Sequence, residues 1–184
     1  MSRVPPRSRP PAAAREPGRL RVFLALWPDA DTCRALAAWR DAQPWPGGVR
    51  RTPDDKLHLT LHFMGSQPAA RVAALAAALL PPPQPFSLVL TTAQIWRGGL
   101  VALCPREIPA ALALWHGQLA ERLHALALPV EARAFRPHVT VARDAGPRPV
   151  LAEPAPLEWP VHRLVLVEST TDGRYRILRE GPVA

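Results

Sequence analysis

Apolar and polar residues alternate along several short stretches of the chain, as expected of β-strands with one buried face. The first stretch, residues 20–27, has one uniformly aliphatic face, while the other carries Arg21, Phe23, Ala25 and Trp27. That second face could hold phosphate and stack a base, or be covered by a helix or loop. Further strands are predicted at residues 56–63, 86–96, 100–103, 136–143, 157–169 and 174–178, with turns at Gly98-Gly99 and Asp172-Gly173.

Three other stretches repeat apolar residues every three or four positions, which predicts helices. They cover residues 28–41, opened by Pro28-Asp29, residues 69–80, and residues 108–126. Gly65-Ser66 is predicted to end the preceding strand, with Ser66 as N-cap of the second helix. His116 and His124 lie off the apolar stripe of the third helix, so we expect both on the solvent side. Strand runs joined by hairpins, with helices outside, predict an α+β fold with antiparallel sheets.

Two of the predicted strands contain the same motif, a His and a Thr two residues apart. The motif is His58-Leu59-Thr60-Leu61 in one strand and His138-Val139-Thr140-Val141 in the other. Since successive side chains of a strand point to opposite faces, each His shares a face with its Thr and is backed by aliphatic residues. A His-x-Thr is expected by chance only about 0.26 times in a chain of this composition. The duplication predicts two pseudo-symmetric lobes, whose polar faces line a central cleft.

The amino-acid composition indicates which class of partner the protein binds. The net charge is +8, and arginine supplies all but one of the 23 basic residues, which favours polyanionic partners, nucleic acid first. The arginine bias can equally reflect genome composition.

Two cysteines make neither a disulfide framework nor a metal cluster, so a cytoplasmic protein is expected. No apolar run is long enough to span a membrane. Residues 1–18, rich in Pro and Arg, are expected to be a disordered tail, and residues 19–184 to form one domain.

Two opposed imidazoles suit acid–base chemistry at phosphorus. Near neutral pH one histidine can be protonated and the other neutral, so one can take a proton from water while the other protonates a leaving oxygen. Threonine hydroxyls and arginines can hold the non-bridging oxygens. This scheme requires neither metal nor cofactor.

A zinc site is the main rival use of these histidines. His58 and His62 are four residues apart, which suits a shared ion on a helix but places them about 13 Å apart on a strand. The alternating leucines favour the strand, so we predict no zinc site. His62 shares the strand face of His58 in this reading, and could line the cleft or be an ordinary exposed position.

The two motifs resemble the paired HxTx motifs of the 2H phosphoesterase superfamily, and most closely its RNA 2′,3′-cyclic phosphodiesterase branch, also called 2′-5′ RNA ligase-like. The similarity extends over most of the chain after residue 19. The segments that carry it are residues 20–26, residues 57–65, residues 135–143, and residues 166–178 with Glu168-Ser169 and Gly173-x-Tyr175. Thr91-Thr92-Ala93 departs from the family, which often has a glycine there.

The resemblance implies a bilobal fold and opening of an RNA terminal 2′,3′-cyclic phosphate to a 2′-phosphate. By that likeness His58 is the proton donor and His138 the proton acceptor, although the pseudo-symmetry of the motifs leaves this order open from sequence alone. Thr60, Thr140 and Arg143 would bind the phosphate. Phe23 and Arg136 are further candidates for substrate contact.

Two other functions fit the same residues. One is a module that binds RNA ends with little turnover, which the basic charge and the Arg21, Phe23 and Trp27 face favour. The other is 2′-5′ joining of RNA ends by the reverse reaction, which abundant water disfavours. We expect a monomer that binds RNA ends or a related nucleotide and no membrane.

Overall fold

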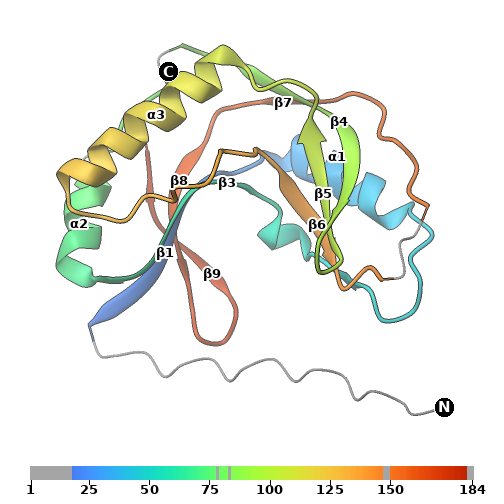
Figure 1. The fold of residues 1–184 in the computed structure, drawn as a ribbon, viewed down its shortest axis with the longest axis horizontal. Helices are drawn as coiled ribbons and strands as arrows, with labels where there is room; N and C mark the ends of the chain where they lie inside the picture. Colours follow the sequence, from blue (N-terminus) through green and yellow to red (C-terminus); the bar gives the residue numbers. More distant parts are fainter. Residues whose placement is uncertain (1–17, 78, 83, 147–149, 182–184) are drawn as a thin grey trace.

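A computed structural model describes residues 18–77, 79–82, 84–146 and 150–181 (Figure 1). It has one antiparallel sheet and three α-helices, the predicted α+β class. The strands are β1 (Arg19–Leu26), β2 (Arg50–Arg51), β3 (Leu59–Pro68), β4 (Ser87–Trp96), β5 (Leu100–Pro105), β6 (Val139–Arg143), β7 (Leu157–Pro160), β8 (Leu164–Ser169) and β9 (Tyr175–Glu180). The helices are α1 (Ala30–Asp41), α2 (Ala69–Ala77) and α3 (Ala110–Ala125), with a short 3₁₀ turn at Asp54–Lys56.

The sheet consists of two groups of four strands that meet in its middle. The order is β7-β4-β5-β6 followed by β3-β1-β8-β9, with β2 paired to β6. β3 and β6, the strands of the two motifs, are joined through the pairing of Leu59 with Val139. The sequence predicted a separate sheet for each lobe; this contact instead makes them one sheet.

The two faces of β1 belong to different clusters of buried side chains. Val22, Leu24 and Leu26 lie in the main core with the apolar residues of all three helices. Phe23 and Ala25 lie in a second, smaller cluster with Val165 and Val167, flanked by Trp27, Phe63 and Tyr175. This alternation follows the two-residue period of the strand. The second face of β1 is therefore covered by neighbouring aromatic side chains and not by a helix.

Several predicted elements are confirmed to within a residue or two. The side chain of Asp29 accepts a hydrogen bond of 2.7 Å from the backbone N–H of Thr32 and caps α1. The turn at Gly98-Gly99 connects β4 and β5, and both glycines have positive φ. A Cβ at Gly99 would lie 2.7 Å from the backbone nitrogen of Ala145, so only glycine fits there.

Other boundaries differ from the prediction. The predicted strand at residues 157–169 is two strands, β7 paired with β4 and β8 paired with β1 and β9. Pro160, which has no backbone N–H to donate, ends β7. β3 runs past Gly65 to Pro68, so Ser66 pairs with Arg21 and does not cap α2. The stretch between α1 and β3 contains β2, a strand that the sequence did not indicate.

The predicted disordered tail lies outside the described residues except for Gly18, whose carbonyl accepts a hydrogen bond from Ala69. Among the described residues, no helix is long and apolar enough to cross a membrane.

Candidate active site

His58 and His138 occupy equivalent positions, each immediately before the strand of its motif. Their Nδ1 atoms lie 2.7 Å from the backbone oxygens of Lys56 and Arg136, two residues earlier in each case. Since a carbonyl can only accept, Nδ1 of both rings must carry the hydrogen. In the neutral state, Nε2 of each ring therefore has a lone pair that can accept a hydrogen bond.

The threonine of each motif is half-buried. Thr60 lies 3.1 Å from Nε2 of His58 and donates its hydroxyl hydrogen to that lone pair. Across the ladders, Thr60 is opposite Ala25 and Thr140 is opposite Ala102. The predicted pairing of His58 with Thr60 on one face is confirmed.

Aromatic rings surround the two histidines. The ring centroid of His58 is 5.0 Å from that of Phe23, 5.3 Å from that of Tyr175 and 5.6 Å from that of Trp27, which stacks on it. The ring of His138 lies 4.4 Å from that of Trp96. Sequence reasoning did not assign Trp27, Tyr175 or Trp96 a role beside the histidines, because these contacts join residues far apart in the chain.

Burial and nearby positive charge keep both histidines neutral at pH 7. Burial lowers the pKa of His58 to about 4. The hydrogen bond to the backbone oxygen of Lys56 raises this pKa, whereas positive charge on His138 and Arg143 lowers it. Burial also lowers the pKa of His138, assisted by Arg133, Arg136 and Arg143. Arg143 is thus electrostatically coupled to both imidazoles, and His138 to His58. The three predicted residues therefore lie within electrostatic range of one another.

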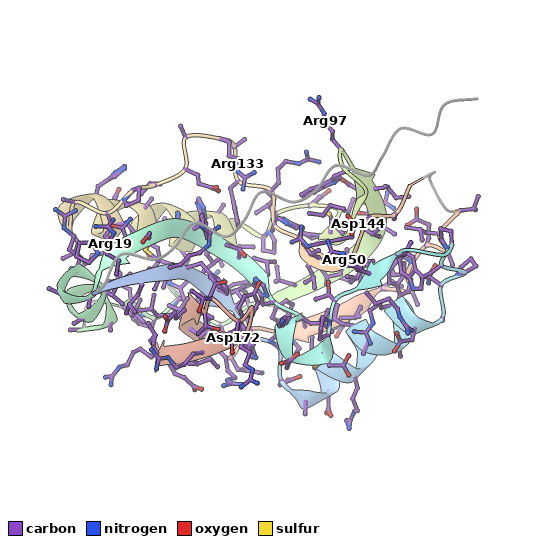
Figure 2. All side chains as sticks on the ribbon, turned by 90° about the horizontal axis from the view of Figure 1, so that it is seen from below. Arg19, Arg50, Arg97, Arg133, Asp144 and Asp172 are labelled. Atoms are coloured by element: carbon purple, nitrogen blue, oxygen red, sulfur yellow. The ribbon has the colours of Figure 1, made fainter. Side chains whose placement is uncertain are left out.

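Arg143 is the last residue of β6 and is exposed. Its partner across the ladder, Arg50, forms an ion pair with Asp144, and Figure 2 shows these two side chains side by side. Arg143 itself forms no ion pair with any described residue, so its charge is available to an anionic ligand.

The two weaker candidates lie on opposite sides of the histidine pair. Phe23 is 4% exposed and packs against the His58 ring, which leaves little of its surface for a substrate. Arg136 is exposed, and its guanidinium lies 4.4 Å from the ring centroid of Trp96. Arg136 also donates a hydrogen bond of 3.3 Å to the side-chain oxygen of Gln94.

His62 does not share the face of His58, contrary to the prediction. Leu24 pairs with His62 and Ala25 with Thr60, so Leu61 is an extra residue in a β-bulge. The bulge interrupts the alternation and turns His62 towards α3, where it is 2% exposed and donates a hydrogen bond of 2.9 Å to the backbone oxygen of His116. The alternative of an exposed position is also wrong.

His116 is half-buried, which corrects the prediction that it is solvated. Its ring is stacked between His62 at 4.0 Å and Phe135 at 3.9 Å. Burial lowers its pKa to about 4. His124 is exposed, as predicted. Within the part of the chain that the structure describes, no three His, Cys, Asp or Glu side chains gather as a metal site.

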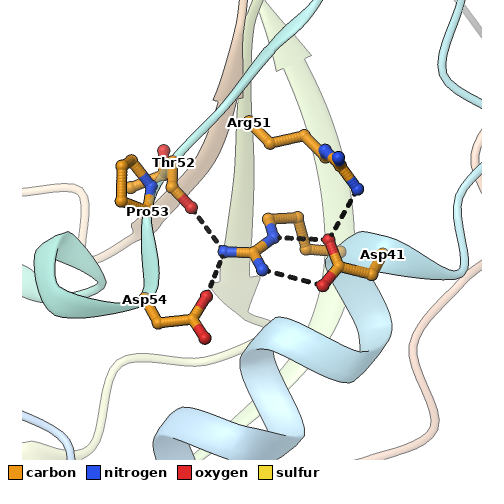
Figure 3. A pocket seen from close by; sticks show the side chains of 6 residues that line it. Asp41, Arg51, Thr52, Pro53 and Asp54 are labelled. Carbon is orange, nitrogen blue, oxygen red and sulfur yellow. Dashed lines mark hydrogen bonds and ion pairs between the residues drawn. The ribbon is translucent and has the colours of Figure 1, made fainter.

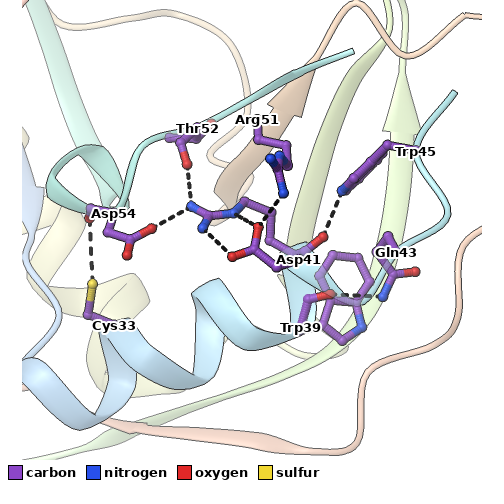
Figure 4. A network of polar contacts seen from close by, with 9 residues as sticks. Cys33, Trp39, Asp41, Gln43, Trp45, Arg51, Thr52 and Asp54 are labelled. Carbon is purple, nitrogen blue, oxygen red and sulfur yellow. Dashed lines mark hydrogen bonds and ion pairs between the residues drawn. The ribbon is translucent and has the colours of Figure 1, made fainter. Parts of the chain in front are cut away.

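A hollow of about 340 Å³ lies at the end of α1 and is lined by ion-paired side chains (Figure 3). Arg40, 6% exposed, donates to both carboxylate oxygens of Asp41 at 2.9 and 2.8 Å, and lies 2.7 Å from Asp54. It also donates to the backbone oxygen of Thr52. Figure 4 shows how these contacts, with the one from Cys33 to the Asp54 carbonyl, tie α1 to the loop that leads to His58. Because each arginine here has an acidic partner, we assign this hollow a structural role.

Replacing Arg40 with Met should lower the free energy of unfolding by about 1–3 kcal/mol, because two carboxylates and a carbonyl lose a buried donor. Arg34→Ala is the matched control, since Arg34 forms an exposed ion pair with Asp31 on the same helix. Its loss should cost at most about 0.5 kcal/mol. Urea unfolding of both variants measures the difference, and equal losses would show that the Arg40 network does not hold the loop.

Comparison with known proteins supports the family resemblance that the two motifs indicate. Residues 24–173 match the 2′-5′ RNA ligase superfamily. The RNA 2′,3′-cyclic phosphodiesterase of Escherichia coli (strain K12) is 32% identical over 141 residues, which cover 76% of this chain and 80% of the relative. Escherichia coli LigT complexed with 3′-AMP superposes with a TM-score of 0.79 at 28% identity, covering 90% of this chain and 99% of LigT.

Other solved structures show the same fold. The protein TT0787 of Thermus thermophilus superposes with a TM-score of 0.69 at 27% identity, covering 88% of this chain and 97% of that protein. LigT has also been solved with NADP⁺ and with ATP. The matched region contains both His-x-Thr motifs and most strands of the sheet. The chain therefore belongs to the 2′-5′ RNA ligase superfamily of 2H phosphoesterases.

Proposed function

We propose that the protein hydrolyses RNA terminal 2′,3′-cyclic phosphodiesters to 2′-phosphomonoesters by two-histidine acid–base catalysis. The observation that carries this proposal is the equivalent anchoring of His58 and His138, each through Nδ1 to a carbonyl two residues before it. That anchoring leaves two Nε2 atoms to exchange protons with a substrate. The relationship to an Escherichia coli RNA 2′,3′-cyclic phosphodiesterase supports the same substrate class.

In the proposed mechanism His138 accepts a proton from the attacking water at Nε2. The water oxygen bonds to phosphorus while the bond from phosphorus to O3′ breaks in line with it, in a cleft between the two motifs. His58 donates a proton from Nε2 to O3′. Thr60, Thr140 and Arg143 hold the non-bridging oxygens and stabilise the charge that builds on them. Arg136 contacts the substrate beside His138, and Phe23 acts mainly by supporting the His58 ring.

The acid role of His58 requires a proton that the free protein does not hold at pH 7, since burial lowers the pKa of His58 to about 4. A bound phosphate anion next to the ring favours its protonated form and raises this pKa. Substrate binding would therefore supply the charge that makes His58 an acid. His138 needs no such change, because its lowered pKa already leaves it neutral and ready to act as a base.

The proposal is tested by product analysis. The purified protein is incubated with an oligonucleotide that ends in a 2′,3′-cyclic phosphate, in the presence of EDTA, and the products are resolved. A 2′-phosphate end is expected. A 3′-phosphate end, or no hydrolysis together with salt-dependent RNA binding, would contradict it, the second result favouring a module that only binds RNA ends.

A further inference from the structure

The short 3₁₀ turn at Asp54–Lys56 holds the ring of His58 and is itself held from two sides. The backbone oxygen of Lys56 accepts the hydrogen bond of 2.7 Å from Nδ1 of His58. On one side, the ion pairs drawn in Figure 4 tie the turn to α1. On the other side, Nζ of Lys56 donates a hydrogen bond of 2.7 Å to the backbone oxygen of Gly173. Lys56 therefore joins the anchor of His58 to the connection between β8 and β9.

The connection between β8 and β9 is a turn with a fixed shape. The backbone N–H of Gly173 donates to the oxygen of Thr170 at 3.1 Å, and the N–H of Thr170 donates to the oxygen of Arg174 at 2.9 Å. The carboxylate of Asp172, labelled in Figure 2, accepts a hydrogen bond of 3.2 Å from the backbone N–H of Arg174. Because these bonds hold the turn together, the bond from Lys56 fixes the position of the whole turn and of the strand that follows it.

Tyr175 follows this turn as the first residue of β9 and forms one wall around His58. Its ring lies edge-on to the imidazole, at 5.3 Å between centroids and an interplanar angle of 86°. Nζ of Lys56 lies 5.7 Å from the centroid of the same ring, within the range of a cation–π contact. The other rings against His58, those of Phe23 and Trp27, come from β1 and the residue after it, and β1 pairs with a strand on each side. Since β9 is the last strand of the sheet and pairs with β8 alone, the sheet supports the Tyr175 wall less.

We propose that Lys56 is a positioning residue for the acid of the reaction: its side chain holds the turn between β8 and β9 in place and thereby keeps Tyr175 against the ring of His58. The inference rests on the proposed function, because it takes His58 as the acid. Without the bond to Gly173, the start of β9 can move away from the imidazole and water can reach the ring. The ring then keeps its backbone anchor but loses one wall.

Two measurable changes follow from the loss of this wall. A ring that moves relative to the bound phosphate is a poorer proton donor, because proton transfer requires the donor within hydrogen-bond reach of the leaving oxygen. Water around the ring should also raise the pKa of His58 towards its ordinary value, because burial is the main cause of its lowering. The charged groups that act on this ring, His138 and Arg143, do not belong to the turn and keep their places.

The test compares Lys56→Met with Lys56→Arg in the full-length protein. Methionine keeps the apolar stem but cannot donate to Gly173, whereas arginine keeps a charged donor. At the maximum of its own pH profile, Lys56→Met should lose about tenfold in kcat while KM stays within about twofold. NMR titration of the His58 ring protons should show a pKa raised by about one pH unit. Lys56→Arg should recover most of both effects. Arg174→Ala, which removes an exposed cation from the same turn and leaves the bond to Gly173, should match the wild type.

A double-mutant cycle shows whether Lys56 acts through Tyr175. Loss of the positive charge of Lys56 by itself favours protonation of a nearby imidazole, so the charge must be separated from the contact. Tyr175→Leu removes the wall and leaves the charge. Adding Lys56→Met to Tyr175→Leu should change kcat and the pKa of His58 by less than half of what it changes in the wild-type protein. Fully additive effects would overturn the proposal.

The outcomes separate this inference from the proposed function. Unchanged kcat and pKa in Lys56→Met would overturn the positioning role while the hydrolysis stands. A rise in KM alone would do the same, because it would make Lys56 a direct contact of the substrate. If the wild-type protein does not hydrolyse the cyclic substrate, the proposed function fails, and the NMR titration of the free protein still judges the role of Lys56. A pKa of His58 that rises in Lys56→Met and returns in Lys56→Arg supports that role, and an unchanged pKa contradicts it.

Discussion

His58→Ala and His138→Ala should each lower kcat/KM for a 2′,3′-cyclic substrate by about 10²–10⁴-fold, because each removes one partner of the proton transfer. Both rings are anchored through Nδ1 and present Nε2, so neither can replace the other without moving. The measurement is the initial rate of hydrolysis, with circular dichroism to verify folding.

The chain provides a matched control for this loss. His124 is exposed on α3, so His124→Ala should keep the wild-type rate. His58→Gln and His138→Gln preserve more of the ring volume and guard against an effect of the cavity left by alanine. Retention of more than a tenth of the activity by a folded variant at either position would show that the two histidines are not the acid–base pair.

Arg143→Ala should lower kcat/KM by about 10²–10³-fold, the effect expected when one charged donor to the developing phosphate charge is lost. A second effect follows from electrostatics. Arg143 lowers the pKa of both His58 and His138, so its removal should raise both pKa values. NMR titration of the histidine ring protons measures this shift independently of turnover.

Two variants define the specificity of this effect. Arg97→Ala removes an exposed arginine at the β4–β5 turn and should change neither the rate nor the pKa values (Figure 2). Arg143→Lys keeps the charge and loses the planar fork of donors, so it should retain the low pKa values and recover only part of the rate. Activity of Arg143→Ala within threefold of wild type would remove Arg143 from the phosphate site.

The sequence predicted the centre of the site because its geometry is local. His58 and Thr60 are two residues apart on a strand, so the period of the strand alone places them on one face, as the hydrogen bond between them confirms. The apolar stripe of α3 and the glycine turn between β4 and β5 are local patterns of the same kind. Pro160 was also a readable signal, since a proline inside a predicted strand indicates an edge or an end.

The sequence could not predict features that depend on distant partners. The bulge at Leu61 arises from how β3 pairs with β1, and it alone turns His62 away from His58 and into contact with His116. Trp96 reaches His138 from β4, two strands away from β6 in the sheet. Tyr175 reaches His58 from β9, at the edge of the sheet. These contacts are set by the strand order, which no short pattern in the chain encodes.

The dependence of kcat/KM on pH tests the acid–base pair most directly, because it reports the ionisation of the free enzyme. His58 must be protonated and His138 neutral, and both pKa values lie below the ordinary value of about 6.5. The profile should therefore be bell-shaped with its maximum below pH 6.5, and should fall about tenfold per unit between pH 7 and 9 as protonated His58 disappears. Because the two histidines interact, the apparent pKa values of the two limbs of the profile belong to the pair and not to either residue alone. A profile that is flat or rises between pH 7 and 9 would contradict a protonated histidine as the acid.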